Sequence, residues 1–418
     1  MFNYSILKIQ KVRQVGALYS SMIAGVILGI IVSVLNTRIL GPEAFGDFKY
    51  IHSLYSFLAI LIAFGYLVTT SKLLAEKKNN GIRKELIGSS LVICSILGLI
   101  FIVVMLLFSI IQRNYFAKDL SSLIIMLAPL FFFIPFVSGL ENIFQGENRI
   151  YELAIYRMAP QLLYILVISV LFKFGHINLK TVLVTQLSLF GVIIIISVLY
   201  LKPSLKNLKN TLGLISKDNK LYGFNVYIGS VIGVATTHFG PIVISFFSPN
   251  NTDVGFFSLA VTITMPLALI PTVVGTSMFK EFANRSEVSV KATKMTILIS
   301  LISLILFVLL IRPLVLHLYS SDYSQVVNLA YIVSIGQIFH GFGNYFNRFL
   351  GSKGKGKYLR NGAIMVGITN LTGYIILVPV FGAYGASWTK LSSGIVFILS
   401  MIYYYKKFRM TSLKKLPS

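Results

Sequence analysis

The chain alternates long apolar segments with short polar connections. A helix that crosses the hydrocarbon core of a bilayer, which is roughly 30 Å thick, needs about 20 residues with few charges. This pattern predicts an all-α, polytopic membrane protein with about twelve membrane-spanning helices. The predicted helices lie near residues 16–36, 50–70, 87–111, 123–145, 153–172, 181–201, 224–246, 256–279, 295–316, 325–347, 361–380 and 386–405.

The composition supports this interpretation. Hydrophobic residues make up 56% of the 418 residues and charged residues 12%, and the mean hydropathy is +0.81. A soluble chain of this length is much less apolar. The first apolar segment is longer than a signal-peptide core and is followed by no small-residue cleavage site, so we expect it to be retained as a helix. The single cysteine, Cys94, lies in an apolar run and indicates packing, with no disulfide or metal framework.

The net charge is +24, but the basic residues are spread over short connections. A nucleic-acid-binding protein would gather them on one surface, so no nucleic-acid partner is predicted. With the N-terminus placed inside, the cytoplasmic connections contain 27 Lys and Arg residues and the opposite ones contain seven. The positive-inside rule therefore predicts that both termini are cytoplasmic.

The longest connection, residues 203–221, falls near the middle of the chain. Leu208, Leu212 and Ile215 recur there at helical spacing, opposite Lys209 and Lys217. This pattern predicts an amphipathic cytoplasmic linker attracted to anionic lipid, with a plain basic linker as the alternative. The linker would join an N-terminal six-helix lobe, residues 1–202, to a C-terminal six-helix lobe, residues 222–418.

The two halves share a weak internal repeat. Gly46 and Gly255 occupy similar turns and are 209 residues apart, and Gly146 and Gly354 are 208 apart. Six helices per half is an even number, so each half keeps the same orientation. The pattern predicts a parallel pseudo-repeat about an axis along the membrane normal.

A polar turn after the first apolar segment contains the motif Arg-x-Leu-Gly-Pro-Glu-x-Phe-Gly. Glycine and proline there predict a sharp reversal at the outer surface, after a helix that ends at Asn36. We interpret the motif as a gate or turn signature. Its residues are Arg38, Leu40, Gly41, Pro42, Glu43, Phe45 and Gly46.

This motif, the basic glycine turns and the twelve-helix pattern resemble the polysaccharide repeat-unit flippases (O-antigen type, Wzx-like) of the multidrug/oligosaccharidyl-lipid/polysaccharide exporter superfamily. The resemblance covers nearly the whole chain and implies the two-lobed fold of multidrug and toxin extrusion (MATE) transporters. It implies a bacterial inner-membrane protein that moves undecaprenyl-diphosphate-linked oligosaccharides to the outer leaflet by alternating access. The product would serve O-antigen, lipopolysaccharide or capsule synthesis, with a polymerase and a chain-length regulator as partners.

A diphosphate-bearing substrate needs cations along its path, and ionisable residues inside membrane spans are costly unless they have such a role. Arg157 and Arg348, one per lobe, are candidates for bidentate diphosphate binding. The alternatives for them are snorkelling to the interface or an ion pair with Glu141. Lys390 and His238 are candidates for a second cationic station, with a buried structural role as the alternative for His238. His52 and His340 are weaker candidates for the same cationic station.

Two other functions stay open at this point. A cation-coupled multidrug exporter generally has a membrane-embedded carboxylate, and none lies in the first, seventh or eighth predicted helix. A membrane glycan polymerase would need a long charged external loop, which this chain lacks, and no catalytic or metal motif occurs. We therefore expect a non-enzymatic transporter without a cofactor, and leave coupling to H⁺ or Na⁺ open.

Overall fold

The computed structural model describes residues 2–77, 79–175 and 177–413. Met1 and residues 414–418, which include the ends predicted to be cytoplasmic, lie outside the described residues. Within them the chain is helical and has no strand, as the sequence predicts. In chain order the elements are α1 (Phe2–Ile62), α2 (Tyr66–Glu76), α3 (Asn80–Tyr115), α4 (Ser121–Leu127), η1 (Leu130–Phe133), α5 (Ile134–Gly146), α6 (Ile150–Phe174), α7 (Leu179–Leu201), α8 (Leu208–Asp218), η2 (Asn219–Gly223), α9 (Phe224–Ser230), η3 (Val231–Ala235), α10 (Thr236–Phe247), α11 (Thr252–Ser277), α12 (Phe279–Asn284), α13 (Val290–Leu318), η4 (Ser321–Tyr323), α14 (Gln325–Ser352) and α15 (Gly356–Leu413).

The described helices account for the predicted number of spans. Eight are long and apolar enough to cross a membrane, and two bent helix pairs raise the number to as many as ten. The longest two, α1 and α15, are each divided by a non-helical glycine, Gly41 and Gly382. Counting each of these as two spans gives about twelve. The chain is therefore a multi-pass membrane protein, and the predicted fold class is confirmed.

The predicted turn after the first helix is tighter in the structure than the sequence indicated. The helix does not end at Asn36 but continues to Leu40, and the break is confined to Gly41, with φ 71° and ψ 173°. Thr37 supports the extension because its hydroxyl donates to the Ser33 carbonyl oxygen at 2.8 Å. A positive φ suits glycine, and proline suits the first turn of the following helix, so Gly41 and Pro42 suffice for the reversal.

The second predicted span is also shifted. It was expected at residues 50–70, but the helix that begins at Pro42 ends at Ile62. Phe64 and Gly65 follow with φ of 46° and 81°, and α2 starts at Tyr66. The left-handed backbone at two consecutive residues cannot continue an α-helix.

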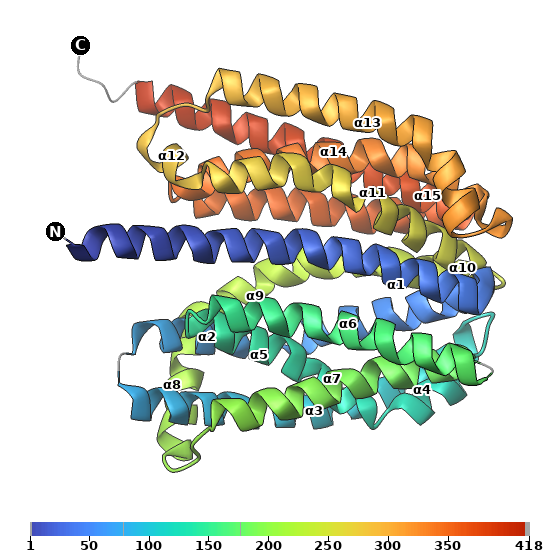
Figure 1. Cartoon of the computed structure of the whole chain (residues 1–418), viewed down its shortest axis with the longest axis horizontal. Coiled ribbons are helices and arrows are strands. Elements are labelled where there is room, and N and C mark those ends of the chain that lie inside the picture. The colour runs from blue at the N-terminus through green and yellow to red at the C-terminus, as the bar shows by residue number, and fades with distance from the viewer. Residues whose placement is uncertain (1, 78, 176, 414–418) are drawn as a thin grey trace. The chain divides into compact units, whose positions relative to one another are not determined.

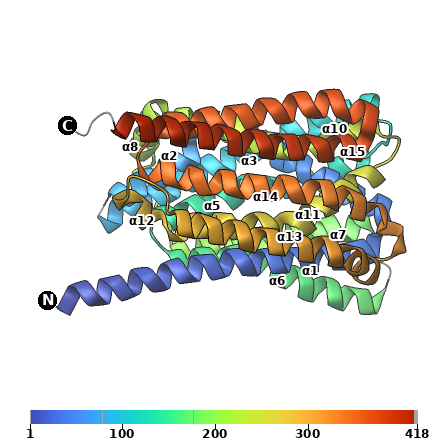
Figure 2. The same ribbon diagram turned by 90° about the horizontal axis from the view of Figure 1, so that it is seen from above.

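Residues group by packing into two compact units. The first runs up to Leu40 and includes Leu54–Val231, and the second comprises Gly41–Ser53 and the chain from Ile232 onwards. In the second unit α11, α13, α14 and α15 lie side by side in both views (Figures 1 and 2), with α14 packed against both α11 and α15. The lobe boundaries expected from the sequence, 1–202 and 222–418, stay a prediction.

The predicted linker forms helix α8, which packs on α2 and α3 in the first unit. Ile215 is fully buried, and the Thr211 and Ser89 hydroxyls are hydrogen-bonded. Lys72 of α2 contacts Asp218 with its Nζ at 3.0 Å from the carboxylate, and this hydrogen bond raises the pKa of Lys72. The lysines of the linker remain exposed. Exposed lysines and a buried isoleucine therefore occur along the same short helix, and protein covers part of its apolar face; the role of a cytoplasmic linker stays a prediction.

Gly46 and Gly255, which the sequence identified as equivalent positions of a repeat, touch each other inside the second unit. A Cβ atom on Gly255 would lie 3.2 Å from the Gly46 Cα, and one on Gly46 would lie 1.7 Å from the Asn251 carbonyl oxygen. Asn251 also donates from Nδ2 to Asp47 Oδ1 at 2.8 Å. The helix after Gly41 is therefore fixed to the start of α11 by backbone contact.

Candidate functional site

Five basic side chains of the second unit lie well away from the ends of their membrane-spanning helices. Lys49 and His52 come from the helix after Gly41, His238 from α10, His340 from α14 and Lys390 from α15. With a rise of about 1.5 Å per residue, they lie about 10 to 22 Å from the helix ends predicted to be outer. They therefore span the depth from one leaflet to near the bilayer centre. We call these five residues the basic cluster.

The helices bring members of the basic cluster together although they are far apart in sequence. His52 lies close enough to Lys49 and His238 for their charges to interact, and Lys390 has the same relation to His238 and His340. The chain thus forms a connected series from Lys49 through His52, His238 and Lys390 to His340. The sequence indicated His238 and Lys390, with His52 and His340 as weaker candidates, and the structure adds Lys49.

Within the described residues, the carboxylate nearest in depth to the basic cluster is Asp47, which lies two residues before Lys49 and accepts a hydrogen bond from Asn251, and no carboxylate acts on His238, His340 or Lys390. Asp253 falls near a helix end predicted to be outer, and Glu281 near an end predicted to be inner. Among the described residues, the Lys390 ammonium has no hydrogen bond and no ion pair, and the buried Nδ1 of His340 has no partner. Positive charge inside a low-dielectric region is costly without compensation. The cluster therefore suits an anionic ligand with oxygen acceptors.

Close helix packing fixes the cluster's side chains. A Cβ on Gly336 of α14 would lie 3.0 Å from the Lys390 carbonyl oxygen, so α14 and α15 meet at the backbone beside Lys390. The His340 ring packs on Phe397 with a centroid separation of 4.8 Å. Near His238, Asn370 donates to Thr236 at 3.3 Å across α15 and α10. Such small-residue contacts are how membrane helices approach closely.

The other predicted cations lie elsewhere. Arg157 of α6 is in the first unit, where its Nε lies 3.0 Å from Glu141 Oε1, which is the ion pair weighed as its alternative role. Arg348 is exposed, four residues before the end of α14. Arg38 and Glu43 lie exposed on either side of the Gly41 break. The two candidate arginines therefore do not join the basic cluster within the second unit.

A small polar cavity occurs in the first unit between α1, α6 and α7. It has a volume of about 30 Å³ and is lined in part by Gln161, Tyr164 and Gln186. The Oε1 atoms of both glutamines are buried without a partner, and the Tyr164 hydroxyl donates to Asn36 Oδ1 at 2.6 Å. The volume is enough for one water molecule, which could donate to both amide oxygens.

The fold matches solved transporter structures. A lipid II flippase, MurJ, in an inward closed conformation aligns with a TM-score of 0.71 and 18% identity, over 95% of this chain and 90% of that chain. An inward-facing multidrug resistance MATE family transporter aligns with a TM-score of 0.70 and 16% identity, over 94% and 96%. A transporter of the same superfamily from Pyrococcus furiosus aligns with a TM-score of 0.59 and 15% identity, over 96% and 95%. These likenesses define the fold class as that of membrane transporters and flippases.

The family follows from the sequence. The profile of the polysaccharide biosynthesis protein family matches residues 12–279, and the chain belongs to this family. The predicted resemblance to polysaccharide flippases of the exporter superfamily is thereby confirmed. No curated protein matches the chain by sequence.

Proposed function

We propose that the chain is a flippase that moves undecaprenyl-diphosphate-linked oligosaccharide repeat units from the cytoplasmic to the outer leaflet of a bacterial inner membrane. The exported units would serve synthesis of a surface polysaccharide such as O-antigen or capsule. Membership in the polysaccharide biosynthesis family supports a lipid-linked glycan as the substrate, and the transporter fold supports its movement across the bilayer. Both termini are proposed to be cytoplasmic.

The observation that carries the proposal is that Lys390, His238 and His340 interact with one another and not with any carboxylate. A diphosphate brings about two negative charges and several acceptor oxygens. Lys390 offers three N–H donors and has no partner among the described residues, and His238 and His340 offer ring nitrogens beside it. Charge-assisted hydrogen bonds from these groups would replace part of the water that the diphosphate loses on entering the membrane.

The proposed mechanism uses the depth of the cluster. His340 lies nearest the bilayer centre and Lys49 nearest the outer helix end, so the diphosphate would meet one basic side chain after another on its way outward. In alternating access, the site opens to one side of the membrane at a time. Arg157 and Arg348, both nearer the predicted inner surface, are proposed to meet the substrate earlier on its route.

Export of cationic drugs is the alternative function that the MATE-like fold raises. A site for cations needs negative charge, which the basic cluster does not supply. Coupling to H⁺ or Na⁺ remains a proposal. The polymerase, the chain-length regulator and anionic lipid around the α8 lysines likewise remain proposed partners.

The test is replacement of Lys390 by Met in cells whose only copy of the flippase carries the change. Loss of one or two charge-assisted hydrogen bonds of about 2 kcal/mol each should weaken substrate binding about 30-fold or more. We expect a lipid-linked oligosaccharide to accumulate and to stay protected from a membrane-impermeant glycan-modifying reagent. Mass spectrometry of lipid extracts would identify it.

Two controls make the result specific. Lys357→Met removes one positive charge from the exposed inner end of the same helix, α15, and should leave transport unchanged. Lys390→Arg keeps the charge and should retain part of the activity. Normal transport by Lys390→Met, with protein levels equal to wild type, would refute the assigned site. If deletion of the protein leaves lipid-linked glycans unchanged but raises drug sensitivity, the exporter alternative replaces the flippase.

A further inference from the structure

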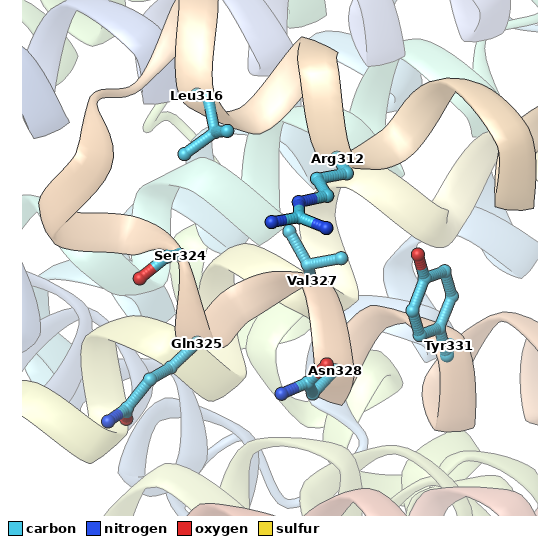
Figure 3. A pocket seen from close by; sticks show the side chains of 7 residues that line it. All are labelled: Arg312, Leu316, Ser324, Gln325, Val327, Asn328 and Tyr331. Atoms are coloured by element: carbon cyan, nitrogen blue, oxygen red, sulfur yellow. The ribbon is translucent and has the colours of Figure 1, made fainter.

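A second polar site lies in the second unit, apart from the basic cluster, at the hairpin between α13 and α14. It is an open cavity of about 420 Å³ (Figure 3). In Figure 3 the Arg312 side chain extends from α13 over Val327, with the Tyr331 ring of α14 to one side and the Asn328 amide beyond Val327. Its lining residues are Arg312, Leu316, Ser324, Gln325, Val327, Asn328 and Tyr331.

The hairpin that forms this cavity is firmly packed. Tyr323 of η4 is 1% exposed and sits edge-on against Phe45 and Phe256, with ring centroids 6.3 and 5.9 Å away. Val315 of α13 is fully buried, and Val327 of α14, which lines the cavity, is 6% exposed. The cavity is therefore preformed, because its walls are set by the core of the unit.

Arg312 makes the cavity suitable for an anion. Its guanidinium carries five N–H donors, and within the described part of the chain it has no hydrogen bond or ion pair. Asp322 lies in the same hairpin but does not line the cavity, and the Ser320 hydroxyl donates to it at 3.4 Å. Ser324, Gln325, Asn328 and Tyr331 add neutral hydrogen-bonding groups. A guanidinium that shares a cavity with neutral hydrogen-bonding groups suits the oxygens of a phosphate.

The surroundings indicate a lipid phosphate. Only Thr296, Ser300, Ile311 and Val315 of α13 are buried, so most of this helix is available to the bilayer. Arg312 lies six residues before the end of α13, or about 9 Å from it, near the level of lipid headgroups. Leu309 and Ile305, 67% and 59% exposed, continue from Arg312 toward the bilayer centre on the same helix face. Acyl chains would lie along this apolar stripe.

We propose that this cavity binds the phosphate headgroup of an anionic phospholipid in the outer leaflet. The leaflet follows from the predicted orientation, in which the α13–α14 hairpin is external. The bound lipid would hold the peripheral helix α13 against α14 at the membrane surface. The proposal does not depend on what the basic cluster transports.

Native mass spectrometry of the purified protein with added phosphatidylglycerol tests the site. Loss of one bidentate charge-assisted contact in Arg312→Gln should weaken phosphatidylglycerol binding about tenfold. Asn328→Ala should weaken it less. Lys294→Gln is the matched control, because it removes one exposed positive charge from the inner end of the same helix and should leave binding unchanged. Equal binding by Arg312→Gln and wild type would overturn the proposal.

Two further measurements separate the possible sources of the phosphate and the leaflet. Inorganic phosphate and a short polyprenyl diphosphate are added as competitors. Tighter, Arg312-dependent binding of the diphosphate than of phosphatidylglycerol would assign the cavity to a transported lipid and overturn the phospholipid assignment. Ser324→Cys in a Cys94→Ser background should react with an impermeant maleimide from outside the cell. Labelling only after the inner surface is exposed would overturn the outer-leaflet assignment.

Discussion

The contact between Gly46 and Asn251 gives the sharpest structural prediction, and the perturbation is Gly46→Ala. The new methyl group would lie 1.7 Å from the Asn251 carbonyl oxygen, whereas real Cβ contacts are longer than 3.0 Å. The two segments must therefore separate by more than about 1 Å. That movement also stretches the 2.8 Å hydrogen bond from Asn251 to Asp47, both of which are buried.

The magnitude follows from these two effects. Overpacking typically costs about 1–3 kcal/mol, and loss of a hydrogen bond to a charged group costs about 1.5–3 kcal/mol. The free energy of unfolding of the second unit should therefore fall by about 4 kcal/mol. For a unit of this size, such a change lowers the melting temperature by about 10 °C.

The assay is thermal unfolding in detergent, followed by the fluorescence of Trp388. This residue is the single tryptophan of the chain and belongs to the second unit. The matched control is Gly25→Ala in the same helix, α1, where an added Cβ has nothing within 4 Å. It should be neutral or slightly stabilising because alanine favours helix more than glycine does. Equal melting temperatures for the two variants would refute the packing argument.

Three other changes have separate readouts. Tyr164→Phe removes the hydroxyl that donates to Asn36 Oδ1 at 2.6 Å, and should destabilise the first unit by about 1–3 kcal/mol. Thiol-dye labelling of the buried Cys94 on heating measures this loss of stability. A labelling temperature equal to that of the wild type would contradict the prediction. Gly382→Ala places a Cβ atom on a residue with φ 52°, at 2.7 Å from Asp253 Oδ2. This variant should have a lower melting temperature, measured by Trp388 fluorescence. The control Gly229→Ala has open space around the new Cβ and should keep the wild-type melting temperature. Replacing the exposed linker lysines by Gln should leave the stability of the protein unchanged and weaken its association with phosphatidylglycerol. If the variant retains as much phosphatidylglycerol as the wild type, these lysines do not bind anionic lipid. These lysines are Lys206, Lys209, Lys217 and Lys220.

The sequence was sufficient for the helical plan because each span must bury its own backbone hydrogen bonds in lipid. Gly41 and Pro42 marked the first reversal correctly. The helix ends were less accurate, since Thr37 and its neighbours extend the first helix beyond Asn36. The interruption at Phe64–Gly65 depends on local backbone geometry, which hydropathy does not report.

For the candidate site, the sequence showed which residues are costly in a membrane but not which of them meet. Lys390 and His238 were singled out by depth, and the structure places them together. The sequence left three roles open for Arg157, and the structure shows the contact of one of them, the 3.0 Å ion pair with Glu141. His52 and His340 gained weight only because helix packing places them beside His238 and Lys390.

By itself, the sequence determined that this chain crosses a membrane many times, that its first reversal falls at Gly41 and Pro42, and how its charge is distributed, because these properties depend on local hydropathy and on single residues. Tertiary structure decided which distant residues share an environment. Gly46 and Gly255 were recognisable as related positions, yet only packing shows that they touch. The basic cluster likewise depends on four helices that meet side by side, and no periodicity within one helix encodes that meeting.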